Sequence, residues 1–287
     1  MNKYMLDPTL SVLFSESVLS LYPILIKSYS TNLYTQTFIR FLMYSLSALL
    51  VGGLSPLYNS YKSTTSYIHN FLYGSLNIVH VVSSYIAFTY LPAGIAMSLF
   101  YTYPLWNILG SMIFLKEKIN TRIIPSFIVS MIGIYLLSYQ DKEAVQFDKI
   151  GLIAVAIAAL TETAIFLVVK ASDTNPFMNI HQLYLSGFVL LLAGLFIPTN
   201  YTSFDNHHLL PLILFNGILG FLGYALRFWS IPKLSTIIYS ILSLFGIISS
   251  FIWGYLFVNE SIELIPFIGG CLIGLSIAYI NYMSKNK

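Results

Sequence analysis

The chain contains one long hydrophobic unit twice. Residues Leu91 to Ile119 align with Leu234 to Ile262 without a gap, which places Glu117 opposite Glu260. After a small change of length the match resumes, with Pro125 opposite Pro266 and Gly133 opposite Gly274. Matches at equivalent places in two halves are the mark of an internal repeat. The duplication therefore predicts two equivalent halves, 1–142 and 143–287, each built from the same succession of segments.

The composition predicts that lipid surrounds these segments. Hydrophobic residues make up 57% of the chain and charged residues 9%, whereas a soluble domain carries roughly 25% charged residues. Such a chain has too few charges to cover itself with a wetted surface. A membrane-spanning helix needs about 20 apolar residues, so 287 residues leave room for about ten spans. The expected fold is an all-α, multi-pass integral membrane protein.

Hydropathy places five spans in each half. The expected spans are 9–27, 34–54, 70–90, 93–115 and 123–139, followed by 150–170, 181–198, 209–229, 236–258 and 264–283. The third span is the most polar, but its counterpart at 209–229 is clearly apolar. The repeat therefore supports ten transmembrane helices as two five-helix repeats.

The basic residues predict the orientation. With the N-terminus inside, the inner loops and tails hold Lys3, Lys62, Lys116, Lys118, Arg122, Lys170, Lys233, Lys285 and Lys287, and the outer loops hold Lys27, Lys142 and Lys149. This excess on one side predicts that both termini are cytoplasmic. Because each half has an odd number of spans, the second repeat enters from the opposite side, and the two repeats are expected to be inverted.

Several kinds of chemistry have no sequence signal here. Cys271 is the single cysteine, so no disulfide, zinc site or redox motif is expected, and neither a metal nor a cofactor. The basic residues do not cluster as nucleic-acid-binding patches do, which argues against a nucleic-acid partner. No cleavable signal peptide is expected, because the first apolar segment ends at Lys27 without a small-residue cleavage site.

Two carboxyl groups are expected inside the membrane. Glu16 lies between two serines in the first span, and Glu162 lies between two threonines in its counterpart, the sixth. A charge near the bilayer centre costs about 2.5–3.5 kcal/mol on insertion scales, so each needs a reason. We interpret the two glutamates as a symmetry-related pair that binds a cationic group or carries a coupling proton. The alternative is that each carboxyl only hydrogen-bonds a neighbouring helix.

The third span carries one polar stripe. Tyr73, Asn77, His80 and Ser84 recur at helical spacing on an otherwise apolar segment. Such a stripe faces protein or water rather than lipid, and we expect it to line a solute pathway. His80 titrates near neutral pH when unperturbed, although a packing role for a lone histidine is the alternative.

Two arginines also fall within spans. Arg227, near the inner end of the eighth span, is expected to extend towards the cytoplasm. Arg40 in the second span has no such route, and we expect it to form an ion pair or bind carbonyl groups. Tyr103 and Tyr239, at helical spacing with small residues in the fourth and ninth spans, are candidate walls of a substrate pocket.

The whole chain resembles the EamA-like branch of the drug/metabolite transporter superfamily. The resemblance rests on Arg40-Phe41, on Leu91 leading into the fourth span, on the mid-span Pro104, on Glu117 and on Gly133. It implies ten helices in two inverted repeats that move a small organic solute by alternating access. In the second copy Ile247 stands where Pro104 would map, so the mid-span break is expected to be missing there. Glu16 also departs from the aromatic-glycine pattern common in the family's first helix.

Three functions compete at this point. The favoured one is a secondary transporter of a small organic metabolite, since two pseudo-symmetric halves can rock about a site between them. Direct ATP hydrolysis is not expected, because no phosphate-binding loop exists. The alternatives are an intramembrane enzyme using Glu16, Glu162 or His80, and a membrane partner or channel-like protein that carries nothing. The sequence predicts neither the substrate nor the oligomeric state.

Overall fold

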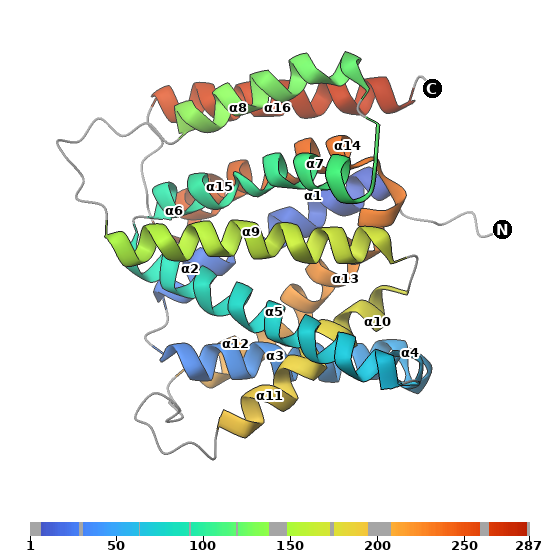
Figure 1. Ribbon diagram of the computed structural model, residues 1–287. Helices are drawn as coiled ribbons and strands as arrows, with labels where there is room; N and C mark the ends of the chain where they lie inside the picture. Colours follow the sequence, from blue (N-terminus) through green and yellow to red (C-terminus); the bar gives the residue numbers. More distant parts are fainter. Residues whose placement is uncertain are drawn as a thin grey trace.

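The computed structural model describes residues 7–28, 31–62, 64–91, 93–118, 120–137, 148–172, 175–194, 208–258 and 264–285. Within these ranges every regular element is helical (Figure 1). The α-helices are α1 (Pro8–Leu19), α2 (Tyr22–Ser28), α3 (Leu33–Gly52), α4 (Leu54–Ser60), α5 (Thr64–Tyr90), α6 (Ala93–Phe100), α7 (Tyr103–Phe114), α8 (Ile124–Leu137), α9 (Lys149–Ala171), α10 (Pro176–Ile180), α11 (Ser186–Gly194), α12 (Leu209–Leu214), α13 (Phe221–Ser230), α14 (Thr236–Ser243), α15 (Phe245–Val258) and α16 (Leu264–Lys285). Short 3₁₀ segments are η1 (Thr121–Ile123) and η5 (Ile231–Lys233), and π-helical segments are η2 (His181–Leu185) and η4 (Phe215–Gly220).

Some of the predicted spans meet the length and apolarity of a membrane helix outright. Among the described residues these are Pro8–Ile26, Thr65–Tyr90, Lys149–Ala171, Leu209–Lys233 and Thr236–Phe257. A sixth is gained if α3 and α4, which bend by 117° at Gly53, count as one span. The apolar helices Thr121–Leu137, Pro176–Leu192 and Leu264–Ile280 are shorter. An all-helical membrane protein is thus confirmed, and the number of ten spans stays a prediction.

Three of the predicted spans are interrupted near their middle. The fourth breaks at Tyr101 and Thr102, between α6 and α7, just before Pro104. The ninth breaks at the equivalent place, at Leu244 between α14 and α15. The expectation that the second copy lacks this break is wrong, because the chain turns there without a proline: the Leu244 amide bonds the carbonyl three residues earlier, at 3.2 Å. The first span is also interrupted, between α1 and α2, next to Pro23.

Equivalent helices of the two halves run in opposite directions. In Figure 1, α6 and α7 run from left to right, whereas their counterparts α14 and α15 run from right to left. The same opposition relates α1 and α2 to α9, and α8 to α16. This is the arrangement that inverted repeats produce. The last pair, α8 and α16, packs through Gly133 and Gly269, where each glycine faces the other's backbone carbonyl and leaves no room for a side chain.

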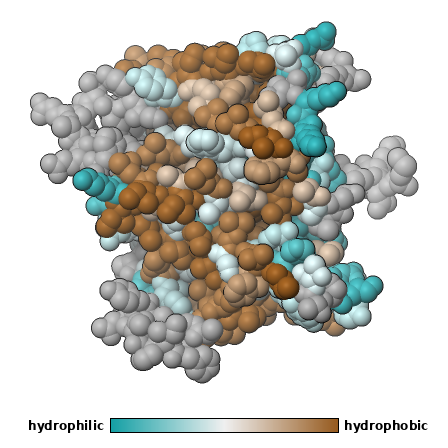
Figure 2. All heavy atoms as spheres, in the orientation of Figure 1, coloured by the Kyte–Doolittle hydropathy of each residue, from teal (hydrophilic) through white to brown (hydrophobic). Residues whose placement is uncertain are grey.

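The outer surface is apolar and the interior is partly polar. Figure 2 shows a broad hydrophobic belt across the bundle, with hydrophilic residues towards its two ends. Large side chains such as Leu50, Phe114 and Leu275 are more than half exposed. A soluble protein rarely exposes so much continuous apolar surface, so the belt is the lipid-facing surface of an integral membrane protein. By contrast, Glu16, Arg40, His80, Glu162 and Arg227 are all buried.

Candidate functional site

A single arginine joins the two glutamates predicted inside the membrane. The Arg227 guanidinium on α13 forms an ion pair with Glu162 on α9, and its Nε lies 3.5 Å from Oε1 of Glu16 on α1. None of the three side chains is more than 4% exposed. A buried carboxylate without a partner is very costly, so the shared guanidinium lets the first helix of each half carry one. The two predicted glutamates therefore converge on one cation.

Three tyrosine hydroxyls hydrogen-bond to members of this charged cluster, which we define as Glu16, Glu162, Arg227 and His80. Arg227 Nε donates to Tyr239 Oη at 2.8 Å, and its Nη2 donates to Tyr103 Oη at 3.3 Å. Tyr101 and Tyr239 donate to the two oxygens of Glu16, at 3.3 and 3.4 Å. Tyr101 lies in the break of the fourth span, Tyr103 directly follows it, and Tyr239 precedes the break of the ninth span, so all three come from the interrupted helices.

The close approach of Tyr101 depends on Gly246. A Cβ at Gly246, at the start of α15, would overlap the Tyr101 hydroxyl and would also touch a Glu16 carboxyl oxygen. The missing side chain thus leaves the space in which Tyr101 reaches Glu16. Gly246 therefore does more than allow two helices to pack closely, because it makes room for the Tyr101 hydroxyl beside Glu16.

The position of Arg227 corrects the sequence prediction. It does not extend to the cytoplasm: its side chain is 4% exposed and ion-paired inside the bundle. Nearness to the end of a span favours extension towards water only when no carboxylate is within reach. Here the stronger interaction is with Glu162, and the guanidinium turns inward.

His80 lies on the far side of Glu162. Its Nε2 is 3.1 Å from Glu162 Oε2, and its Nδ1 is 3.2 Å from the Ala158 carbonyl oxygen and 3.3 Å from Thr161 Oγ1. A protonated Nδ1 donates to the carbonyl. His80 Nε2 and Glu162 Oε2 are thus within ion-pair distance of each other.

The polar stripe of the third span is divided among different neighbours. Ser84 donates its hydroxyl to the His80 carbonyl at 2.7 Å, one turn back on α5. Asn77 donates to the Leu183 carbonyl at 3.3 Å and so contacts η2 rather than the charged cluster. Tyr73 is half-buried and stacks on His69. Only the His80 and Ser84 end of the stripe reaches the centre of the bundle.

Arg40 has neither of its predicted partners. Within the described chain it forms no ion pair and donates to no carbonyl. Its Nη2 donates to the hydroxyls of Tyr224 at 3.0 Å and Tyr184 at 3.4 Å. The Tyr22 ring lies 4.2 Å below the guanidinium carbon, in the geometry of a cation–π contact. Aromatic rings and phenols replace the expected anion.

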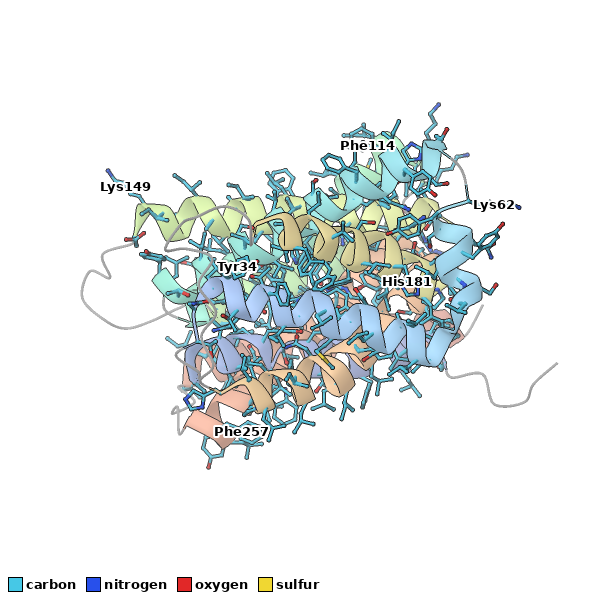
Figure 3. All side chains as sticks on the ribbon, turned by 90° about the horizontal axis from the view of Figure 1, so that it is seen from below. Tyr34, Lys62, Phe114, Lys149, His181 and Phe257 are labelled. Atoms are coloured by element: carbon cyan, nitrogen blue, oxygen red, sulfur yellow. The ribbon has the colours of Figure 1, made fainter. Side chains whose placement is uncertain are left out.

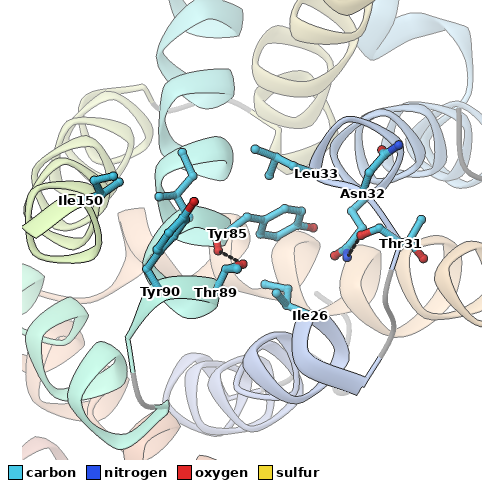
Figure 4. A pocket seen from close by; sticks show the side chains of 10 residues that line it. Ile26, Thr31, Asn32, Leu33, Tyr85, Thr89, Tyr90 and Ile150 are labelled. Atoms are coloured by element: carbon cyan, nitrogen blue, oxygen red, sulfur yellow. Dashed lines mark hydrogen bonds between the residues drawn. The ribbon is translucent and has the colours of Figure 1, made fainter. Parts of the chain in front are cut away.

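Two hollows meet at this site. A central cavity of about 50 Å³ is lined by side chains that include Glu16, Arg40, His80, Ser84, Tyr101 and Arg227. A wider vestibule of about 770 Å³ is lined by Thr31, Asn32, Gln36, Thr89, Ile150 and others (Figure 4). Ile26 and Tyr85 line both. The vestibule therefore adjoins the central cavity, and these two side chains lie between them.

The sequence candidates fall into three groups. Glu16, His80 and Ser84 line the central cavity, Glu162, Tyr103 and Tyr239 surround Arg227 behind it, and Asn77 contacts a different helix. The sequence analysis missed Tyr101 and the central place of Arg227. A signal for Arg227 was present: two carboxylates and two guanidiniums lie within the spans, and charges at that depth need partners.

Comparisons with known proteins agree with this architecture. The model of the EamA-like transporter family matches twice, at residues 9–139 and 149–282. Among solved structures, 29 chains match. One, titled "Crystal structure of protein", has a TM-score of 0.74 at 15% sequence identity and covers 97% of this chain and 98% of its own. That identity shows a shared fold alone. The comparison with curated proteins found no match.

The two family matches coincide with the two halves of the chain. The first covers α1 to α8 and the second covers α9 to α16 nearly to its end. Together they span most of the sequence, with only the connection between the halves and the termini outside. The resemblance stated from the sequence is confirmed: the chain belongs to the EamA-like transporter family.

Proposed function

We propose that the protein is a secondary transporter that moves a small organic metabolite by alternating access between two inverted halves, 1–142 and 143–287. The observation that carries this proposal is the charged cluster beneath a vestibule. Glu16 and Glu162 come from equivalent helices of the two halves and share Arg227. An ion pair that joins both halves at the foot of an open vestibule is a contact that substrate binding can rearrange.

The two ends of the bundle differ in a way that supports this proposal. The vestibule opens at the end where α9 begins, at Ile150. Lys170 lies 20 residues later on the same helix, about 30 Å away, a distance close to the hydrocarbon thickness of a bilayer. Figure 3 shows these two ends, with Tyr34 and Lys149 at one and Lys62 and Phe114 at the other.

Polar contacts join α7 and α14 at the end opposite the vestibule, and in our proposal they keep this end closed. Glu117, after α7, accepts hydrogen bonds from the Thr236 amide at 2.9 Å and from the Thr236 hydroxyl, at the start of α14. Ser111 on α7 bonds the same hydroxyl at 2.9 Å. Lys170 donates to the Leu234 and Ile231 carbonyls that precede α14. The carboxylate also complements the positive end of the α14 dipole. The contacts of Glu117 and Ser111 with Thr236 join the two halves at this end, and those of Lys170 hold the segment before α14 within the second half.

The central cavity is too small for a metabolite in this conformation. Ligand pockets usually measure about 300–1,000 Å³, whereas the space beside Glu16 is about 50 Å³. Substrate entry therefore requires Tyr85 and its neighbours to move, and the Arg227 contacts to change. We propose that Glu16, Glu162 and His80 carry a coupling proton. We also propose that both termini are cytoplasmic, as the basic residues predict.

Transport is tested by loading liposomes with a mixture of small metabolites. Proteoliposomes containing the purified protein are expected to lose particular metabolites faster than protein-free liposomes do, as measured by mass spectrometry. The same metabolite should then show saturation and counterflow. Equal retention in both preparations would contradict transport and favour a membrane partner. Flux without saturation or counterflow would indicate a channel, and a new product in the lumen would indicate an enzyme.

Removing the Glu117 carboxylate should make the end of the bundle opposite the vestibule more accessible to water. We expect Glu117→Gln to raise the reaction rate of a hydrophilic thiol reagent with a cysteine at Ser111, in a Cys271→Ser background, by roughly fivefold. The estimate corresponds to losing about 1 kcal/mol of capping and dipole energy. Ser111 is buried and contacts Thr236, so the reagent reaches it only when this end opens.

The matched control for this variant is Lys118→Gln at the neighbouring exposed position. It also removes one charge but breaks no contact that the structure shows with α14, and its labelling rate should equal that of the parent. The same rate in Glu117→Gln as in the parent would show that the carboxylate does not hold this end closed.

A further inference from the structure

We propose that Arg40 is the binding site for the carboxylate of the substrate, and that the substrate is a monocarboxylate with an aromatic or aliphatic body. This inference rests on the proposed transport function for its physiological role. The site itself is a binding site of this chain, and its test needs no transport.

The first step is the contrast between the two buried guanidiniums. Arg227 contacts two glutamates, whereas Arg40, only 3% exposed, has no carboxylate partner in the described chain. A buried cation is strongly disfavoured unless it is paired. Cation–π contacts and phenol hydroxyls compensate part of this cost. A bound anion would compensate the rest of the cost of burying this charge. Arg40 is therefore the side chain at the cavity that is best suited to bind a negative group.

The second step is that Arg40 has N–H groups available to donate hydrogen bonds to a ligand. Its Nε is buried and has no hydrogen-bond acceptor. Its Nη2 donates to Tyr224 and Tyr184, and a phenol that now accepts can turn and donate to a bound anion instead. The planar fork of a guanidinium matches the two oxygens of a carboxylate. Arg40 and its tyrosines can therefore bind a carboxylate without a new charged group.

The third step is access. Arg40 lines the central cavity together with Tyr85, and Tyr85 also lines the vestibule, where it stands among Ile26, Leu33 and Thr89 (Figure 4). Gln36 on the vestibule wall lies one turn before Arg40 on α3. A solute in the vestibule thus meets Arg40 once the Tyr85 ring swings aside.

The fourth step concerns the class of anion. Arg40 has no carboxylate within ion-pair distance in the described chain, so one negative charge can pair with it directly, and the Glu16 carboxylate in the same cavity disfavours a second. A phosphate monoester, with a charge of about −1.5 to −2, is therefore a poorer fit than a monocarboxylate. Apolar and aromatic side chains form the remaining wall and suit an apolar body: Met97, Phe88, Phe100 and Tyr101.

The test measures binding to purified protein by thermal stabilisation in detergent. The probes are phenylacetate, benzoate and hexanoate, each compared with its neutral amide, together with phenyl phosphate and benzylamine. We expect at least one of the carboxylates to raise the unfolding temperature saturably, with little effect of its amide, of phenyl phosphate or of benzylamine. If no carboxylate stabilises the protein, or if carboxylate and amide act equally, the inference is wrong.

Variants assign the effect to Arg40. Arg40→Gln should abolish stabilisation by the carboxylate, and Arg40→Lys should weaken its affinity by roughly tenfold, because a point charge replaces the bidentate fork. The control is Lys233→Gln, which removes a cation 3.8 Å above the Trp229 ring, away from the cavity lining, and should bind as the parent does. If Arg40→Gln does not fold, Arg40→Lys decides, and an unchanged affinity in it overturns the proposal.

The two proposals fail in different ways. Carboxylate binding through Arg40 in a protein that shows no counterflow would contradict transport and leave this site intact. Saturable counterflow of a neutral or cationic metabolite, unaffected by Arg40→Lys, would support transport and overturn the carboxylate site.

Discussion

Replacing Arg227 by Met should destabilise the protein by about 3–5 kcal/mol, the usual cost of removing one partner from a buried ion pair. Two carboxylates, Glu16 and Glu162, would then face each other without a counter-charge in the centre of the bundle. The hydrogen bonds from Arg227 to Tyr239 and Tyr103 would be lost as well. Thermal unfolding in detergent measures the effect.

The compensating variant separates charge from packing. In Glu16→Gln/Glu162→Gln/Arg227→Met the glutamates and the arginine of the charged cluster are all replaced by uncharged side chains, and most of the lost stability should return, as it does when buried ion pairs are replaced as a whole. Transport should be absent in this variant, because the charged groups of the cluster are gone. Arg122→Met, at an exposed position, is the control and should change stability by less than about 0.5 kcal/mol. If the single Arg227→Met protein is as stable as its parent, the ion pairs do not hold the two halves together.

The parts of the fold that follow from the repeat were predictable from sequence. Helical periods and apolar lengths give the helical class and the order of the segments, and the inversion of the second repeat gives opposite directions for α7 and α15. The break beside Pro104 was also accessible, because proline removes a backbone donor. The matching break at Leu244 was not. No proline marks it, and nearby Gly246 packs against Tyr101, a contact between residues far apart in the chain that no local pattern encodes.

The site was predictable in its ingredients but not in its pairing. Depth in the membrane marked Glu16, Glu162 and Arg40 as residues that need partners. Which cation meets which carboxylate depends on how α1, α9 and α13 cross, and no local pattern encodes that. Arg227 was therefore assigned to the membrane edge and Arg40 to an ion pair or to carbonyl groups, whereas in the structure Arg227 forms the ion pairs and Arg40 is buried among tyrosines.

Replacing either buried glutamate by Gln should reduce transport at least about tenfold, the scale of losing one charge-assisted hydrogen bond. Gln keeps the size and most hydrogen bonds of the side chain but removes its charge and its ability to carry a proton. Glu162→Gln should have the larger effect, because Glu162 forms the direct ion pair and also faces His80. In Glu16→Gln the 3.5 Å contact with Arg227 is weaker from the start.

Uptake into proteoliposomes between about pH 5.5 and 8, the range in which an unperturbed histidine titrates, measures both variants against the parent. If the carboxyls carry the coupling proton, the Gln variants should lose the pH dependence that the parent shows as well as its rate. Asp148→Asn is the matched control, since Asp148 caps the Gly151 amide at the start of α9 at 3.0 Å and Asn caps a helix equally well. It removes a carboxylate outside the centre and should transport normally. Parent rates in both Gln variants across this range would mean that Glu16 and Glu162 serve only to hold α1, α9 and α13 together, and the transport site would then lie elsewhere along the vestibule.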